Sequence, residues 1–276
     1  MVSPQFISRI SLRRDIVESF DNYPFSLPAV RMLDHLEMHP KITYLVGDNG
    51  SGKSTLLEAI AVSFGFNAEG GSKNFNFGTN STHSDLYRYL RIAKGFRKPR
   101  TGYFLRAESF YNVASEIDKL DAEPLTAPRI IDGYGGVSLH HQSHGESFMT
   151  LMTQRFKGQG LYILDEPEAA LSPQRQLAVL SRMHDLVQQG SQFIIATHSP
   201  ILLSYPHAKI VQFDGTGLME VAFEDTEHYA VTRDFLNHYP RRLEQQMNRD
   251  LAKAEQVRTA LSFLAVAVAY AALSYI

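Results

Sequence analysis

Short apolar runs alternate with amphipathic segments along most of the chain. Residues 6–12 alternate loosely between apolar and polar positions, and residues 42–46 form an apolar run that stops at a glycine, so both are predicted to be β-strands. Two further apolar runs, at residues 161–164 and 193–197, are typical of buried strands. Strands that alternate with helices imply a mainly parallel sheet with helices packed against it.

Helical spacing fills most of the chain between these strands. The pattern predicts helices over residues 55–64, 85–120, 145–156 and 172–189. Residues 67–84 are rich in Gly, Asn and Ser, and residues 121–145 contain several Pro and Gly residues, so both are expected to be irregular connections. The expected fold class is therefore α/β, with a helical subdomain at about residues 80–155.

The segment after the strand at residues 42–46 matches the phosphate-binding pattern G-x-x-x-x-G-K-S/T in full, as Gly47-Asp48-Asn49-Gly50-Ser51-Gly52-Lys53-Ser54. Its glycines let successive backbone N–H groups turn inward around phosphates, at the positive end of the following helix. Lys53 would neutralise phosphate charge, and the Ser54 hydroxyl would coordinate Mg²⁺. We therefore expect ATP and Mg²⁺ as ligands, with ATP bound by Asp48, Asn49, Gly50, Ser51, Gly52, Lys53, Ser54 and Thr55.

Two acids, Asp165 and Glu166, end the apolar run at residues 161–164. At the carboxyl edge of a parallel sheet, both would lie beside the phosphates. Asp165 suits Mg²⁺, and Glu166 can polarise the attacking water. His198 closes the next strand, where an imidazole can hold the γ-phosphate and water in register. The predicted metal ligands are Ser54 and Asp165, and the predicted catalytic residues are Glu166, His198 and Lys53.

A second candidate phosphate-binding segment lies upstream of these acids. Ser143-His144-Gly145-Glu146 opens the helix predicted near residues 145–156, and a serine with a glycine at a helix N-terminus can bind phosphate. His140, His141 and His144 with Glu146 could also suggest a metal cluster. No second ligand group is evident, so a role at a dimer interface or beside the phosphates is favoured.

This order of motifs resembles the ABC ATPase family, in which a phosphate loop is followed by a signature segment, an Asp-Glu strand and a switch histidine. The resemblance covers about residues 5–215 and implies a P-loop NTPase fold of ABC type. It also implies that two copies pair head to tail around two ATP molecules. Ser143, His144, Gly145 and Glu146 of one copy would then form the signature that faces the γ-phosphate held by Lys53 of the other.

In the mechanism that this resemblance implies, water attacks the γ-phosphate in line, with Glu166 as base and His198 as the switch. Leu171-Ser172 resembles the loop that touches the partner's site in that family. Catalysis in such sites is mostly positioning and charge stabilisation. The ATPase domain is expected to span residues 1–240. Residues 241–258 are charged and compatible with a helix, and they lead into an apolar tail, so residues 241–276 are expected to form a C-terminal helical extension.

The chain departs from the family pattern at two places. The transporter-type signature is Leu-Ser-Gly-Gly-Gln, whereas here Gln142, His144 and Glu146 replace its leucine, first glycine and glutamine. No glutamine lies between residues 75 and 141, where the family's Q-loop falls, and Glu108 or Asn112 is the candidate substitute. Both departures favour a resemblance to the non-transport RecF, SMC and Rad50 ATPases and their compact relatives, although no heptad insertion predicts a coiled-coil arm.

Two functions stay open at this point. The first is a non-transport motor or regulatory ATPase that acts on DNA or in a repair or defence complex, and the second is the ATP-binding subunit of an ABC transporter. A module that traps ATP without turnover is disfavoured, because the full set of predicted catalytic residues is present. The expected partners are a second copy of the chain on ATP binding and a protein that the motifs do not identify.

Composition changes this picture little. The chain has no cysteine, which excludes a disulfide framework. Its formal net charge is −2, which gives no global attraction to nucleic acid. The start of the chain lacks a secretory pattern, so a cytoplasmic location is expected. Residues 259–276 carry no charge, and their length is at the short limit for a membrane span. They are interpreted as a membrane anchor, a helix buried against a partner, or an unstructured extension.

A cluster of seven basic residues is the one local attraction for nucleic acid. It consists of Arg88, Arg91, Lys94, Arg97, Lys98, Arg100 and Arg106, with Tyr87, Tyr89, Phe96, Tyr103 and Phe104 interleaved. Such a patch could follow a phosphate backbone and stack bases. The alternative is a solvated helical face with the aromatic side chains packed beneath it.

Overall fold

The structure is a computed structural model that describes residues 5–73, 84–108, 110–122, 129–214 and 217–248. The chain divides into two compact units, Met1–Thr226 and Glu227–Ile276. The first unit contains every motif identified above, and the two units are described separately below.

A six-stranded sheet forms the centre of the first unit. Its strand order is β5-β6-β7-β3-β8-β9, with β3 at Ile42–Gly47, β5 at Thr101–Arg106, β6 at Gly160–Asp165, β7 at Gln192–Ala196, β8 at Lys209–Asp214 and β9 at Gly217–Val221. All neighbours are parallel except β8 and β9, which form an antiparallel pair at one edge. The mainly parallel sheet predicted from the sequence is therefore confirmed, and its carboxyl edge carries the predicted site.

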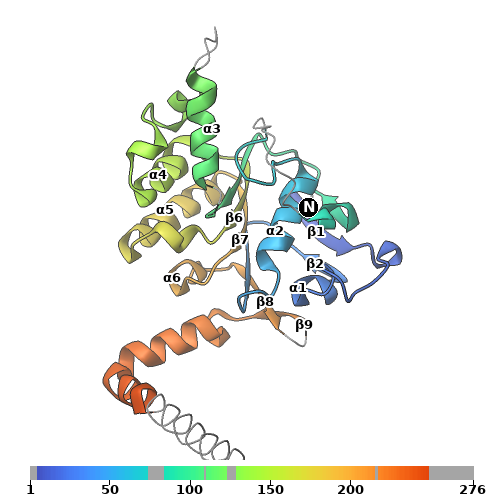
Figure 1. The fold of residues 1–276 in the computed structure, drawn as a ribbon, viewed down its shortest axis with the longest axis vertical. Coiled ribbons are helices and arrows are strands. Elements are labelled where there is room, and N and C mark those ends of the chain that lie inside the picture. Colours follow the sequence, from blue (N-terminus) through green and yellow to red (C-terminus); the bar gives the residue numbers. More distant parts are fainter. Residues whose placement is uncertain (1–4, 74–83, 109, 123–128, 215–216, 249–276) are drawn as a thin grey trace, which may run out of the picture. The chain divides into compact units, whose positions relative to one another are not determined.

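Helices cover both faces of this sheet (Figure 1). The elements are α1 at Pro28–Arg31, α2 at Lys53–Phe64, α3 at Phe110–Ala122, α4 at His144–Thr150, α5 at Pro173–Gln188 and α6 at Pro200–Leu203, and α4 continues into a π-helical turn at Leu151–Arg155. Alternate side chains of β3 enter different cores: Tyr44 packs with α3 to α6, and Leu45 packs with α1 and α2. This two-sided burial explains why the strand is apolar at successive positions.

A small antiparallel sheet in the order β2-β1-β4 lies beside α2, with β1 at Ile7–Leu12, β2 at His35–Glu37 and β4 at Leu90–Lys94. The prediction of a mostly helical segment at residues 85–120 is wrong for its first part, because residues 90–94 and 101–106 are strands and only the 3₁₀ turn Asp85–Tyr89 precedes them. Pairing with β1 selects the extended form of β4, since it buries Leu90 and leaves Arg91 in solvent. The α-helical part of the segment begins at Phe110.

The α3 helix holds the irregular connection that leads to α4. Ser115 Oγ lies 3.0 Å from a ring nitrogen of His140, and the Ser138 hydroxyl donates to Asp118 at 2.6 Å. Asp121 accepts two backbone N–H groups at the start of the 3₁₀ turn Ile130–Tyr134. The connection predicted as irregular thus contains only short 3₁₀ turns in its described part, and side chains of α3 fix its path.

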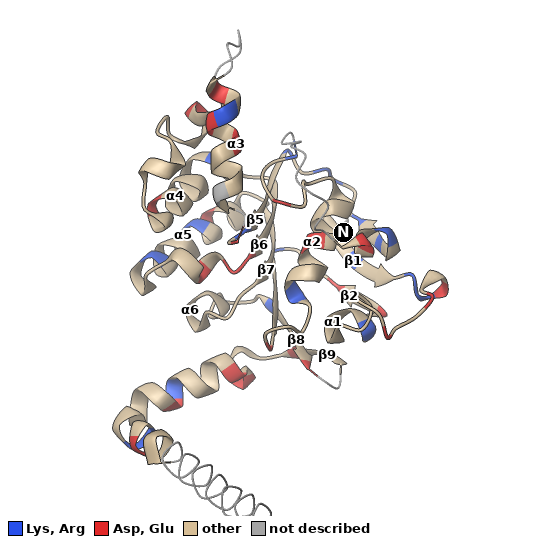
Figure 2. Ribbon diagram, in the orientation of Figure 1, with Lys and Arg blue, Asp and Glu red and all other residues tan. Residues whose placement is uncertain are grey.

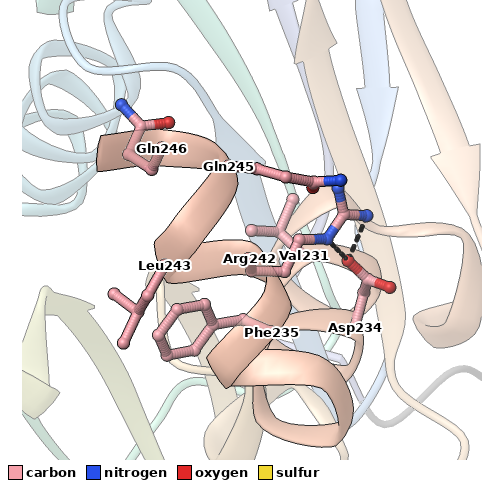
Figure 3. A pocket seen from close by; sticks show the side chains of 7 residues that line it. All are labelled: Val231, Asp234, Phe235, Arg242, Leu243, Gln245 and Gln246. Carbon is pink, nitrogen blue, oxygen red and sulfur yellow. Dashed lines mark hydrogen bonds and ion pairs between the residues drawn. The ribbon is translucent and has the colours of Figure 1, made fainter. Parts of the chain in front are cut away.

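In the second unit, residues 227–248 are helical, and their ribbon turns between Phe235 and Leu243 (Figure 3). Pro240 lies within this turn, as expected where a proline interrupts helical hydrogen bonding. Arg242 reaches back across the turn to form an ion pair with Asp234. The apolar tail interpreted at residues 259–276 lies outside the described residues. Within the part that the structure describes, no helix combines the length and hydrophobicity that crossing a bilayer requires.

Candidate functional site

The predicted phosphate loop joins β3 to α2. Gly47 has a φ of 148°, and a Cβ there would lie 2.4 Å from the carbonyl oxygen of Phe213 on the neighbouring strand. Gly52 has a φ of 98° and forms the N-cap of α2, where a Cβ would lie 2.9 Å from that of Leu27. Both positions therefore need glycine on conformational and steric grounds. The loop ends at the N-terminus of a twelve-residue helix, where backbone N–H groups have no intrahelical partner.

Lys53 folds back onto this loop. Its ammonium donates to the carbonyl oxygens of Gly47 at 2.7 Å and Asp48 at 2.8 Å, and the side chain is largely buried. Burial lowers the pKa of Lys53, and the nearby carboxylates of Glu166 and Asp165 act in the opposite direction. The two carbonyl contacts thus hold a cation at the mouth of the loop.

Ser54 and Asp165 meet across the sheet edge. The Ser54 hydroxyl donates to Asp165 Oδ1 at 2.9 Å, which joins the start of α2 to the end of β6. Asp165 is buried, and burial raises its pKa to about 6, although the Ser54 hydrogen bond and the charge of Arg106 lower it. A hydroxyl and a carboxylate in contact are hard oxygen donors that fit Mg²⁺.

Replacing Asp165 by asparagine is expected to stabilise the nucleotide-free protein at pH 8 by up to about 3 kcal/mol, at about 1.4 kcal/mol per pKa unit. The folded protein binds this proton more tightly than the unfolded chain, whose aspartate has a pKa of 3.8. The penalty for ionised Asp165 is therefore small below pH 4, grows between pH 4 and 6, and is fully present above pH 6. Urea unfolding at pH 4 and pH 8 measures it, and an equal difference between the proteins at both pH values would contradict the prediction.

Glu166 and His198 lie at the ends of β6 and β7. Glu166 has a φ of 48°, in the left-handed region, and its backbone N–H donates to the carbonyl oxygen of Ala196 at 2.9 Å. Glu166 Oε1 lies 3.7 Å from His198 Nε2, and the Glu166 side chain is 46% exposed. Burial and then the charge of Lys53 lower the pKa of His198, against the attraction of Glu166. A neutral imidazole beside an accessible carboxylate suits proton transfer.

Arg106 belongs to the cluster of seven basic residues in the sequence, but in the structure it lies inside the site. It ends β5 opposite Asp165 in the register, and its guanidinium donates to Glu58 of α2 at 2.6 Å. Glu58 is buried and also accepts the backbone N–H of Ser84 at 3.1 Å. Arg106 thus links the edge strand β5 to α2, the helix that follows the phosphate loop. The sequence did not indicate this role, because Arg106 follows a run of exposed basic residues.

Arg106→Gln is expected to destabilise the protein by roughly 3 kcal/mol, because it leaves the Glu58 carboxylate buried without its cation. The matched control is Arg9→Gln, which breaks a surface pair with Glu37 and should cost less than about 1 kcal/mol. Chemical denaturation of both variants at pH 7.5 provides the comparison. Equal costs for the two substitutions would show that the Arg106 pair is not a buried structural link.

The two candidates for the Q-loop position differ in their surroundings. Asn112 donates to Glu69 at 3.3 Å, in the segment after α2. Glu108 lies 3.6 Å from Arg106, and its charge is among those that raise the pKa of Asp165. Glu108 is therefore the candidate whose charge reaches the predicted metal ligands.

The predicted signature residues form the start of α4. The Ser143 hydroxyl and backbone N–H both donate to Glu146 Oε2, at 2.6 and 2.9 Å, in a capping box. His144 and Glu166 both line a small pocket of about 110 Å³ between the ends of β5 and β6 and the starts of α3 and α4. The signature segment therefore lies near Glu166 of its own chain.

The other six basic residues of the cluster lie in the 3₁₀ turn Asp85–Tyr89, on the edge strand β4 and in the turn after it. Figure 2 colours all described Lys and Arg residues blue. These six residues are exposed. Tyr103 and Phe104 belong to the core, and Phe96, at 84% exposed, is the one fully accessible aromatic side chain among the five. The alternative interpretation, a solvated helical face above packed aromatic side chains, is therefore wrong in one part and right in the other. The face is not helical, because the cluster follows a strand and turns, but some of the aromatic side chains are packed in the core.

Two family models match the chain. A model described as an AAA domain matches residues 26–120, and a second AAA domain model, described with the AbiEii toxin of a type IV TA system, matches residues 129–204. Together they span more than half of the sequence and include all the predicted site residues.

Curated relatives carry ATP-binding names. The macrolide export ATP-binding/permease protein MacB of Marinobacter nauticus is 27% identical over 73% of this chain and 33% of its own length. The tungstate uptake system ATP-binding protein TupC of Campylobacter jejuni is 26% identical over 66% of this chain and 58% of its own. The chain spans between 23% and 58% of the length of the curated relatives it matches.

Two solved structures are also similar to the chain. The SMC head domain from Thermotoga maritima is 16% identical, with a TM-score of 0.40 over 79% of this chain and 98% of that chain. An ATP-binding cassette of an ABC transporter in its ADP conformation is 17% identical, with a TM-score of 0.45 over 78% of this chain and 90% of that chain.

Proposed function

Because the chain belongs to the ABC-type ATPases, we propose that it hydrolyses ATP in composite sites formed between two copies of itself. Membership in this family implies ATP hydrolysis, and the composite site is the specific proposal. The observation that supports it best is the Ser54–Asp165 hydrogen bond, since Lys53 and Glu166 lie around it at the same sheet edge. The start of α2 and the end of β6 thus bring together a cation for the phosphates, two oxygens for the metal and a candidate base.

Nucleotide binding would begin with an exchange of partners at Lys53. In the free chain its ammonium is bound to the carbonyl oxygens of Gly47 and Asp48, and phosphate oxygens would replace these weaker acceptors. Ser54 and Asp165 would hold Mg²⁺, which when bound offsets charge on the phosphate oxygens. Burial raises the pKa of Asp165, and a cation bound beside it would act in the opposite direction and favour its ionised form.

Glu166 would then act as the base in hydrolysis. Its carboxylate is accessible and lies 3.7 Å from His198 Nε2. Glu166 would accept a proton from the attacking water, and His198 would hold water and γ-phosphate in register. The backbone N–H of His198 donates to the half-buried Glu168 at 2.6 Å, which holds the backbone that carries the imidazole.

The second copy would close the site with the segment Ser143–Glu146. The exposed Ser143 lies at the start of α4, and its hydroxyl would exchange Glu146 for a γ-phosphate oxygen. Leu171-Ser172, which precedes α5, would touch the partner's site as the family resemblance implies. Residues 48–55 would form the opposite half.

For the output, we favour a non-transport motor or regulatory role in a DNA-related, repair or defence complex. Two departures from the transporter pattern support this choice: Glu146 replaces the glutamine of the signature, and no glutamine lies between residues 75 and 141. The ATP-binding subunit of a transporter is the alternative, and the names of MacB and TupC favour it. The exposed basic residues of β4 and the turn after it would serve a nucleic-acid partner, and residues 259–276 a membrane or protein contact.

Phosphate release from ATP by the purified full chain, with Mg²⁺ and with excess EDTA, tests the enzymatic part of this proposal. Hydrolysis that requires Mg²⁺ and rises faster than linearly with protein concentration supports sites shared between two copies. Hydrolysis that is strictly proportional to protein concentration over the range where the chain is monomeric would contradict the composite site. Adding duplex DNA to the same assay separates the DNA-related role, which predicts a salt-sensitive change in rate, from the transporter role.

A further inference from the structure

Glu146 places a carboxylate where the signature must approach a phosphate. Its Oε2 accepts both the hydroxyl and the backbone N–H of Ser143, and these hydrogen bonds lower the pKa of Glu146. The group is therefore ionised at neutral pH. If the γ-phosphate of a nucleotide on a second copy meets Ser143, it also meets this negative charge, and like charges at such distances repel strongly once water is excluded.

Arg175 is the cation that faces Glu146. It lies in the first turn of α5, and its Nη2 is 3.7 Å from Glu146 Oε1. Its guanidinium also packs over the start of α4, since a Cβ at Gly145 would lie only 2.2 Å from Arg175 Nη1. The same Cβ would lie 2.8 Å from the carbonyl oxygen of Ala170, so Gly145 allows α4, α5 and the turn after Glu166 to meet.

The ion pair contributes little to the stability of the isolated chain. The side chains of Arg175 and Glu146 are 38% and 56% exposed, and pairs this exposed are screened by water and salt. Their interaction gains strength only when a surface covers them and removes that water. The approach of a second copy with its nucleotide is such an event, so the pair has its largest effect in the closed dimer.

We propose that Arg175 is a positioning residue that neutralises Glu146, so that the Ser143–Glu146 segment can close onto a nucleoside triphosphate held by a second copy of this chain. The inference rests on the proposed function. Arg175 acts through Glu146, keeping the segment neutral as it approaches the phosphate. The backbone N–H of Arg175 donates to the N-cap Ser172, so Arg175 contacts both segments that are predicted to reach the partner.

A double-mutant cycle of Arg175→Gln and Glu146→Gln tests this inference. The full-length chain is used, and the measured quantity is the protein concentration at which half is dimeric in saturating Mg-ATP. Arg175→Gln alone should raise this concentration at least tenfold. Arg175→Lys keeps the positive charge, so its concentration should stay much closer to that of the wild-type chain. Glu146→Gln alone should lower it, since the repelling charge is gone. In the Glu146→Gln background, Arg175→Gln should change it by less than twofold.

Two controls separate charge compensation from a structural effect. Arg129→Gln removes another exposed ion pair of the helical region, with Asp132, and should leave dimerisation unchanged. ATP affinity of the monomeric chain should be unaffected by Arg175→Gln, because Arg175 serves the partner's site. A loss from Arg175→Gln that is equal in both Glu146 backgrounds, or no loss at all, overturns the inference while leaving the proposed function intact. A wild-type chain that stays monomeric in Mg-ATP overturns both.

Discussion

Glu166→Gln is expected to reduce the rate of ATP hydrolysis by roughly a hundred- to ten-thousandfold, the range in which a general base contributes to catalysis. The amide keeps the size of the side chain but accepts no proton from water. ATP binding should persist, since Lys53, Ser54 and Asp165 are unchanged. Single-turnover phosphate release and equilibrium binding of a fluorescent ATP analogue measure the two effects separately.

The control for this substitution is Glu37→Gln, which makes the same chemical change at a carboxylate of β2 with similar exposure, 48% against 46%. Its hydrolysis rate should match that of the wild-type chain. A Glu166→Gln protein that hydrolyses ATP within threefold of wild type would show that another group activates the water. Glu108 and Glu168 would then be the carboxylates to replace next.

Lys53→Ala is expected to lower kcat/KM for ATP on the order of a thousandfold, because it removes the cation that would contact the transferred phosphate. The folded chain itself should tolerate the change. Lys53 is buried with a lowered pKa, and the two carbonyl oxygens that it contacts belong to the loop, so its removal also relieves a desolvated charge.

Steady-state kinetics and thermal unfolding of Lys53→Ala, with Lys41→Ala as control, test this second expectation. Lys41 is an exposed residue just before β3, and its backbone makes two hydrogen bonds that an alanine keeps: its oxygen accepts the N–H of Phe193, and its N–H donates to His39 Nδ1. If Lys53→Ala retained near wild-type kcat/KM, the loop between β3 and α2 would not be the nucleotide site. A large loss of thermal stability would show that Lys53 acts as a structural link instead.

The parts of the fold that could be predicted from the sequence depend on local pattern. The glycines at 47 and 52 and the lysine after them define a loop conformation by themselves, and the apolar run before Asp165 has one stable place, inside a parallel sheet. The same holds for α5, whose proline at 173 and apolar spacing are visible in the sequence. For these elements the expected and observed structures agree.

The segment at residues 85–106 shows where local pattern fails. Charges at Arg91 and Lys94 with apolar residues between them fit a helical face as well as an edge strand, and only pairing with β1, some eighty residues earlier, decides in favour of the strand. The burial of Arg106 depends in the same way on Glu58, which lies 48 residues away in the sequence. Such tertiary partners override local preference.

The role inferred for Arg175 was equally hidden from the sequence. Arg175 and Glu146 lie on different helices, and nothing in the spacing of either helix indicates that Gly145 brings them together. The sequence could nevertheless point to the acidic residue at 146 as a departure from the transporter signature. The structure then identified the cation that faces it.

The mass of the full-length Glu166→Gln protein in Mg-ATP, measured by sedimentation, tests the central claim most directly. A site that needs the Ser143–Glu146 segment of a second copy predicts twice the chain mass in Mg-ATP, and a single chain mass in Mg-ADP or in ATP with EDTA. A protein that binds ATP and remains a single chain at every concentration would contradict the account.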